Sequence, residues 1–203
     1  YTGKEGARLR KEASEWAVKR EHLFALAHEM YVVFERGVRE RSARINITRN
    51  SNAHLNITKP YPSNADSIVT LTRTPKLEHQ HRYEHNKGKE AKRLSEEGKH
   101  AGQKLDECNA RASAAIFKHL NEGKGLLYID LHGQFVEEAL SLLRERLSLL
   151  LKNGHDDRLE CIVGAGRHSK NHVARIKPAV HALIKRMKLR YNVDNAGKYT
   201  IYA

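Results

Sequence analysis

An acidic residue and a histidine stand two positions apart at the carboxyl end of a short apolar segment. The segment 126–131 is rich in β-forming residues and predicts a buried strand, with Asp130 near its end and His132 just after it. Alternate residues of a strand project from one face, and open α/β sheets bind ligands at the carboxyl ends of their strands. A carboxylate beside an imidazole fixes the ring's tautomer and raises its basicity, which prepares it for general acid–base catalysis. A purely structural hydrogen bond between the two side chains is the alternative.

A glycine-rich segment follows a second predicted strand, residues 159–163. Gly164 and Gly166 would let backbone N–H groups approach an anion closely. The four polar residues after them would complete a phosphate site: Arg167, His168, Ser169 and Lys170. The third glycine of a dinucleotide-binding motif is absent, and no acidic residue that could hold a ribose occurs before Asp194. The absence of a GKS or GKT sequence excludes a P-loop nucleotide site.

The surplus of positive charge is concentrated near the carboxyl end. The 203 residues include 37 Lys and Arg against 24 Asp and Glu, a net charge of +13, and no acidic residue occurs from Cys161 to Val193. The basic residues of this acid-free stretch are Arg167, Lys170, Arg175, Lys177, Lys185, Arg186, Lys188 and Arg190. Such a stretch predicts a surface that faces phosphate, with nucleic acid as the usual partner, while a solvated charged face is the alternative.

Two segments of the first 122 residues have helical periodicity. Apolar residues of the segment 1–40 recur three, four or seven positions apart, and so do the mostly small residues of the segment 91–115. Spacings that alternate between three and four let two helices lie side by side, so the pattern predicts a long helical hairpin.

The residues between these helices have a different composition. The range 42–84 contains three of the four prolines and no helical stripe, which predicts a flexible insertion. His79, His81 and His85 are candidate metal ligands, but no Cys or carboxylate completes the shell at a suitable spacing. A solvated polar stretch is the favoured interpretation, and we expect no metal site.

Residues 123–203 alternate short strands and helices. The predicted order is a strand at 126–131, a helix at 136–153, a strand at 159–163, a helix at 176–187, and strands at 189–193 and 199–202. The order β-α-β-α-β-β predicts a small mixed sheet with helices packed on it. The fold class is therefore α/β, in the narrower sense α+β, with an N-terminal helical hairpin.

Three motifs of this last part resemble those of the Smr (small MutS-related) domain. Residues 129–133 are similar to its LDLHG signature, residues 162–169 to its glycine-rich G-x-G-x-HS loop, and residues 195–197 to its third signature. Together they span about residues 126–203 in the family's order. Upstream, parts of the segments 9–24 and 94–117 resemble the helical extension that commonly precedes eukaryotic Smr domains.

The resemblance implies an Smr sandwich at 123–203, preceded by a helical extension at 1–122 that holds the insertion. It also implies nucleic-acid binding, often with endonuclease activity, and makes Asp130 and His132 the expected catalytic pair. The expected phosphate-binding residues are Gly164, Gly166, Arg167, His168, Ser169, Lys170, Arg175, Lys177, Asn195 and Gly197.

Two functions are consistent with these residues. The first is a metal-independent endoribonuclease without a cofactor, in which His132 acts as general acid or base and Asp130 orients it. Two-metal cleavage needs several converging carboxylates, whereas RNA carries its own nucleophile in the 2′-hydroxyl, so RNA is favoured over DNA as the substrate. The second is a non-catalytic module that binds RNA or the ribosome, with the helical arm reaching a protein partner.

The sequence also bears on the location of the chain. No apolar run approaches the roughly 20 residues of a membrane-spanning helix, and there is no signal-peptide pattern. Cys108 and Cys161 lie far apart and match no zinc spacing, which predicts free thiols in a reducing compartment. We therefore expect a cytoplasmic protein without a membrane partner, with an organelle or the nucleus as the alternative location.

Overall fold

The computed structural model describes residues 2–53, 75–152, 158–166 and 173–202. The chain divides into two compact units, one made of residues 1–14 and 104–203 and the other of residues 15–103. The first unit therefore joins the ends of two long helices to the whole α+β part of the chain.

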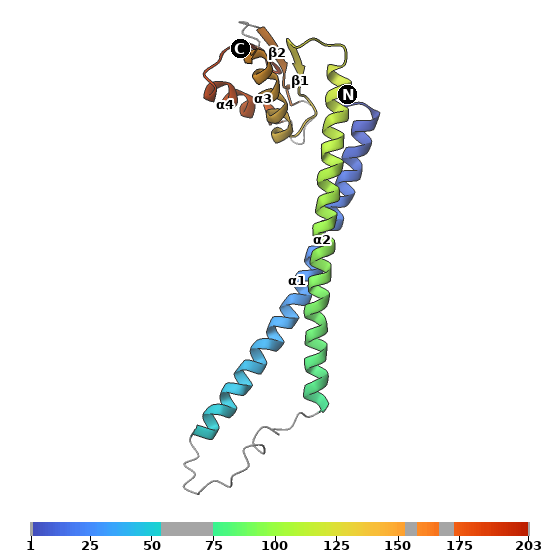
Figure 1. Cartoon of the computed structure of the whole chain (residues 1–203), viewed down its shortest axis with the longest axis vertical. Helices are drawn as coiled ribbons and strands as arrows, with labels where there is room; N and C mark the ends of the chain where they lie inside the picture. The colour runs from blue at the N-terminus through green and yellow to red at the C-terminus, as the bar shows by residue number, and fades with distance from the viewer. Residues whose placement is uncertain (1, 54–74, 153–157, 167–172, 203) are drawn as a thin grey trace. The chain divides into compact units, whose positions relative to one another are not determined.

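The α+β part contains six elements, several of them labelled in Figure 1. They are β1 (Tyr128–Asp130), α3 (Val136–Lys152), β2 (Arg158–Ile162), α4 (Ile176–Arg186), β3 (Arg190–Asn195) and β4 (Lys198–Tyr202). Their order confirms the predicted β-α-β-α-β-β sequence, with small shifts at the ends of elements. Pro178 lies in the first turn of α4, where a missing N–H breaks no helical hydrogen bond.

The four strands form one mixed sheet in the order β1-β2-β4-β3. β1 and β2 are parallel, with Asp130 opposite Ile162, so their carboxyl ends lie at the same edge of the sheet. β4 runs antiparallel to both β2 and β3. The residues that follow β1 and β2, among them His132 and Gly164, are thereby brought to one place.

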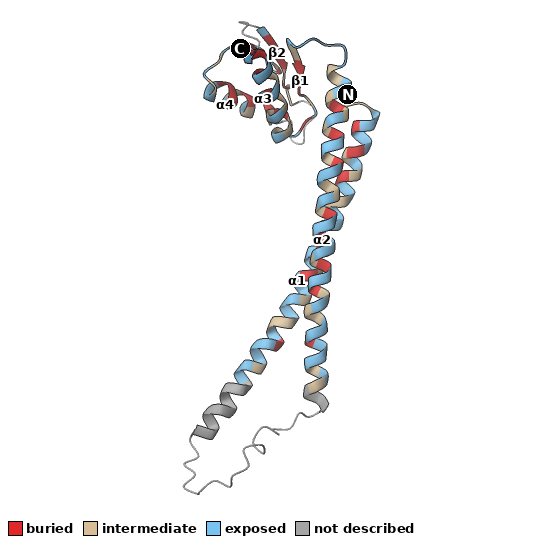
Figure 2. Cartoon of the chain, in the orientation of Figure 1, coloured by how far each residue is buried: buried red, intermediate tan, exposed pale blue. Residues whose placement is uncertain are grey.

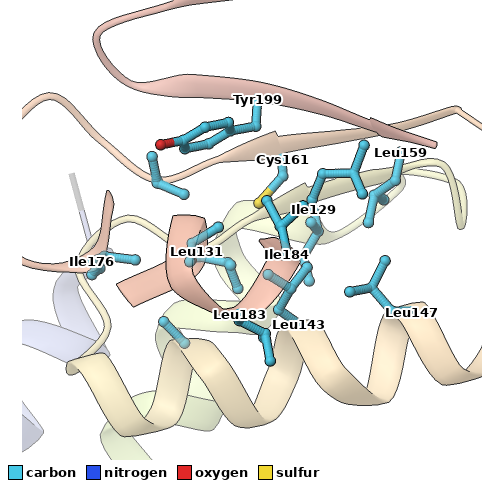
Figure 3. Packing of buried hydrophobic residues seen from close by; sticks show 14 of the residues in the cluster. Ile129, Leu131, Leu143, Leu147, Leu159, Cys161, Ile176, Leu183, Ile184 and Tyr199 are labelled. Atoms are coloured by element: carbon cyan, nitrogen blue, oxygen red, sulfur yellow. The ribbon is translucent and has the colours of Figure 1, made fainter. Parts of the chain in front are cut away.

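One face of the sheet builds the hydrophobic core. Odd-numbered strand residues such as Ile129, Cys161 and Tyr199 are buried against apolar residues of α3 and α4, as Figure 3 shows. Because strand side chains alternate between faces, Asp130 and Glu160 lie on the opposite face. The core thus fixes which face of β1 presents the carboxylate.

The two long helices are α1 (Lys4–Ala53) and α2 (Pro75–Asn121). They run antiparallel, because positions early in α1 meet positions late in α2: Gly6 lies against Ile116, and Gly37 lies against Glu84. Buried residues such as Leu23, Ala27 and Ala101 line the seam, which Figure 2 shows in red along both helices. The predicted helical hairpin is confirmed.

Both helices extend into the range predicted as a flexible insertion. Residues 42–53 continue α1 and residues 75–84 begin α2, while residues 54–74 lie outside the described residues. This range has no apolar stripe, and its described buried contact is polar: Glu84 is 4% exposed and pairs with Arg41 and, at 3.0 Å, with Gln80. Among the described residues, no helix is long and apolar enough to cross a membrane.

Two leucines of α3 provide a matched test of this packing. Leu147 is fully buried in the core, whereas Leu149 is 44% exposed. We expect Leu147→Ala to lower the free energy of unfolding by about 2–5 kcal/mol, because it leaves a cavity, and Leu149→Ala to lower it by less than about 1 kcal/mol. Urea unfolding followed by near-ultraviolet circular dichroism measures both values. Equal losses would contradict the assigned core.

Candidate functional site

Asp130 and His132 form a direct contact at the end of β1. Asp130 is 7% exposed, and Oδ1 of its carboxylate lies 2.7 Å from Nδ1 of His132. The same oxygen accepts the backbone N–H of His132 at 3.0 Å. A carboxylate accepts but does not donate, so Nδ1 carries the hydrogen and Nε2 of the neutral ring has a free lone pair. The two residues thus have the arrangement of a general base, the His132 ring, that is oriented by a carboxylate.

The hydrogen bond from Asp130 raises the pKa of His132 above its ordinary value, and it outweighs the partial burial of the ring, which lowers the pKa. The folded chain therefore favours the charged form of the imidazole more than an unperturbed histidine would. Because the folded-state pKa exceeds the unfolded one, the pair contributes stability that is fully present below the unfolded pKa. This contribution is lost as the pH rises through the folded-state pKa of His132.

The glycine-rich loop lies directly beside His132. Gly164 has a φ of +73°, and a Cβ atom at this position would lie 3.2 Å from Cβ of His132. A side chain at position 164 would therefore crowd the imidazole, and the left-handed backbone would be strained for any residue but glycine. The structure brings together two motifs that are 32 residues apart in the sequence.

Gly197, at the turn before β4, packs on the same loop. A Cβ atom on Gly197 would lie 2.9 Å from the backbone nitrogen of Ala165. The carbonyl oxygen of Gly197 accepts two hydrogen bonds, from Val163 N–H at 2.8 Å and from Gly164 N–H at 3.2 Å. Asn195 shapes this turn, because its Oδ1 accepts the N–H of Gly197 at 2.8 Å. Asn195 and Gly197 of the third motif thus hold the loop through turn and backbone contacts.

These contacts change the interpretation of Gly164. The sequence predicted that its N–H would bind phosphate, but this N–H donates to the carbonyl oxygen of Gly197. The sequence alone did not show this, because the acceptor belongs to the turn between β3 and β4, which is distant along the chain. Gly164 therefore serves close backbone packing beside His132, and the predicted anion-binding amide at this position is already engaged.

The remaining predicted phosphate-binding residues are placed differently. Arg167, His168, Ser169 and Lys170 lie outside the described residues. Arg175 is exposed directly before α4, and Lys177 in its first turn has its Nζ 5.8 Å from the centre of the Tyr199 ring. Gly166 has a φ of +77°, and a Cβ atom there would lie 2.5 Å from the backbone nitrogen of Ala174. Gly166 thus lies directly against the backbone of the segment that leads into α4.

Sequence reasoning missed the residues that hold the segment after His132. Gln134 is 6% exposed and donates from Nε2 to the carbonyl oxygen of Ser113 in α2 at 3.0 Å. Glu138 accepts the N–H of Phe135 at 2.7 Å and pairs with Arg10 of α1, whose Nη1 lies 3.0 Å from its Oε1. A glutamate three residues after the N-cap position is a recognisable helix-start signal, but its ionic partner is not readable from the sequence.

The two cysteines do not add a nucleophile to this site. Both cysteines are free and buried, and burial raises the pKa of Cys161 to about 12, so its thiolate is not available as a nucleophile. Among the described residues, no group of three or more His, Cys, Asp or Glu side chains could hold a metal ion.

The Asp130 contact can be tested by titration. Asp130→Asn removes the negative charge beside the ring, so we expect the pKa of His132 to fall relative to the unmodified chain. An NMR pH titration of the imidazole resonances measures it. Glu160→Gln is the matched control, because Glu160 lies on the neighbouring strand and pairs with Lys198 at 3.0 Å. An unchanged His132 pKa in Asp130→Asn would contradict the contact.

Two glycines test the loop geometry. Gly166→Ala places a Cβ atom against backbone at a positive φ, whereas Gly125→Ala finds nothing within 4 Å. We expect the first change to lower the free energy of unfolding by about 1–3 kcal/mol and the second to leave it nearly unchanged. Thermal unfolding at fixed pH compares the two variants, and a neutral Gly166→Ala would contradict the close approach to Ala174.

The sequence of the chain is similar to those of several known proteins. Residues 78–121, within α2, match a family described as a domain of unknown function, DUF1771. An Smr domain-containing protein of Schizosaccharomyces pombe is 34% identical over 126 residues, which is 62% of this chain and 61% of the relative. Endonuclease NBR9 of Saccharomyces cerevisiae is 31% identical over 120 residues, 59% of this chain and 50% of the relative. The chain thus spans about half to three-fifths of the length of these relatives.

A solved structure also matches. The solution structure of the B3BP Smr domain is 34% identical, with a TM-score of 0.38, and the match covers 47% of this chain and 96% of that domain. The sequence matches to Smr proteins agree with the three Smr motifs and with the βαβαββ order of the elements. The chain belongs to the Smr (small MutS-related) domain family.

Proposed function

We propose that this chain is an endonuclease that cleaves RNA with His132 as its general base. The observation that carries the proposal is the 2.7 Å contact between Nδ1 of His132 and the buried Asp130 carboxylate. This contact orients the ring, and Gly164 leaves space beside it. One of the relatives is named an endonuclease, which supports the reaction class. Residues 123–203 are taken as the catalytic domain and residues 1–122 as its helical extension.

The proposed reaction uses His132 as the base and the RNA 2′-hydroxyl as the nucleophile. Neutral His132 takes the proton of an RNA 2′-hydroxyl at Nε2, and the 2′-oxygen forms a bond to phosphorus. The bond between phosphorus and the 5′-oxygen breaks, and the leaving oxygen takes a proton from water. The products are a 2′,3′-cyclic phosphate and a 5′-hydroxyl end. DNA lacks the 2′-hydroxyl and is not cleaved by this route.

The charge distribution supports a nucleic-acid partner. The exposed residues Arg175, Lys185 and Arg186 belong to the stretch 161–193, which has no acidic residue. Phosphate contacts of this kind supply sequence-independent affinity that falls steeply with salt. Within this proposal the substrate is RNA in the cytoplasm, including RNA on the ribosome.

Loss of the base is the direct test. We expect His132→Ala to lower the cleavage rate about 10²–10⁴-fold while leaving RNA affinity nearly unchanged, because the ring handles the proton and the basic residues hold the phosphates. Cleavage of a labelled RNA under single-turnover conditions measures the rate, and filter binding measures affinity. His28→Ala changes an exposed histidine of α1 and serves as the matched control.

Three results would contradict the mechanism. These are loss of cleavage in EDTA, equal cleavage of DNA, and a product without a cyclic phosphate. If the unmodified chain binds RNA but cuts none at any concentration, the basic stretch serves a non-catalytic module that binds RNA or the ribosome. The acid-free stretch is the observation that favours this second function, since it does not depend on His132.

The pH dependence follows from the raised pKa of His132. A base acts in its deprotonated form, so we expect the cleavage rate to rise with pH through a midpoint above the ordinary histidine value of about 6.5. In Asp130→Asn the midpoint should move to lower pH. A single-turnover pH profile of both proteins measures it, and an identical midpoint in the two would contradict the assigned base.

A further inference from the structure

The outer edge of β1 is covered by a side chain in place of a strand. In the described sheet β1 is the end strand and pairs with β2 alone. Leu131 N–H donates to Ile162 O at 2.8 Å, and Leu127 O accepts Glu160 N–H at 2.8 Å. Because backbone groups of a strand point alternately to its two edges, the N–H and C=O of Asp130 point away from β2.

Both of these backbone groups are bonded to Asn121, the last residue of α2. Oδ1 of Asn121 accepts the N–H of Asp130 at 2.7 Å, and Nδ2 donates to the carbonyl oxygen of Asp130 at 2.9 Å. The second hydrogen of Nδ2 is donated to the carbonyl oxygen of Phe117 at 2.9 Å. Reversing the carboxamide would set donor against donor, so these three bonds fix its orientation.

We propose that Asn121 is a positioning residue for the Asp130–His132 pair, with its carboxamide replacing a neighbouring strand along Asp130. The carboxylate that orients His132 belongs to the residue whose backbone Asn121 holds on both sides of its Cα atom. A displaced Asp130 backbone would carry its carboxylate with it. The hydrogen bond to Nδ1 is only 2.7 Å long, and its strength falls quickly with misalignment.

The segment after His132 is held by the same pair of helices. Gln134 is bonded to Ser113 of α2, and Glu138 is paired with Arg10 of α1. The guanidinium of Arg10 also lies 3.7 Å from the centre of the Phe135 ring. His132 therefore lies between two anchored points, with Asn121 before it and Gln134 after it. This arrangement makes the ends of α1 and α2 part of the site's support.

Asn121→Leu tests the proposal because leucine has a similar size and can make none of the three hydrogen bonds. We expect the His132 pKa to fall relative to the unmodified chain, as Asp130 holds the ring less well. The cleavage rate should fall about ten- to a hundredfold with little change in KM. Asn192→Leu is the matched control: its Nδ2 bonds Tyr202 Oη at 3.1 Å on the strands farthest from β1. His132→Ala assigns the imidazole resonances.

The titration tests the positioning role of Asn121 independently of the nuclease proposal. Only the expected effect of Asn121→Leu on the cleavage rate rests on the nuclease proposal. A folded Asn121→Leu chain with an unchanged His132 pKa would overturn the positioning role, even if RNA is cleaved. A lowered pKa supports the role, even if the unmodified chain cleaves nothing.

Hydrogen exchange of the unmodified chain keeps the test decisive if Asn121→Leu does not fold. We expect the Asp130 amide to be protected from exchange, because Asn121 accepts its hydrogen although none of the described strands lies on that edge. An Asp130 amide that exchanges as fast as that of an unstructured peptide would overturn the proposal.

Discussion

The hydrogen bond between the Asp130 carboxylate and the His132 imidazole is the interaction on which the site depends. One buried oxygen accepts both the ring N–H and the backbone N–H of His132, so the rotamer of the ring and the path of the chain are set together. The fold determines on which face of β1 this contact forms. The core packs one face of β1 against α3 and α4, and the alternation of the strand turns Asp130 to the other face.

Glycine contributes to the site through packing. Gly164 and Gly166 adopt positive φ angles. Gly197 lies so close to the loop that its carbonyl oxygen accepts a hydrogen bond from the N–H of Gly164. The phosphate-binding role expected from the motif therefore depends less on this amide than the sequence suggests. The basic residues of the acid-free stretch are the stronger source of attraction for a polyanion.

Much of the architecture was predictable because it follows from periodicity. The strands and helices of the last 80 residues were visible as short alternating segments, and the Asp130–His132 contact followed from two positions on one strand. Gly164 beside His132 followed from parallel strands that end at one edge. The extent of α1 and α2 was not predictable, since Arg41 and Glu84 form a polar contact without an apolar stripe. The role of Asn121 was not predictable either, because no local sequence pattern shows that β1 lies at the outer edge of the sheet.

The carboxamide at the outer edge of β1 has a consequence for the assembly of the chain. Unpaired strand edges recruit further strands, and natural sheets block such additions. Here a single side chain from α2 occupies both bonding groups of Asp130. Cutting the chain just after this helix residue would uncover the edge, and the severed α+β fragment would then tend to self-associate through strand addition. Asn121 thus occupies the backbone groups to which an added strand would bond.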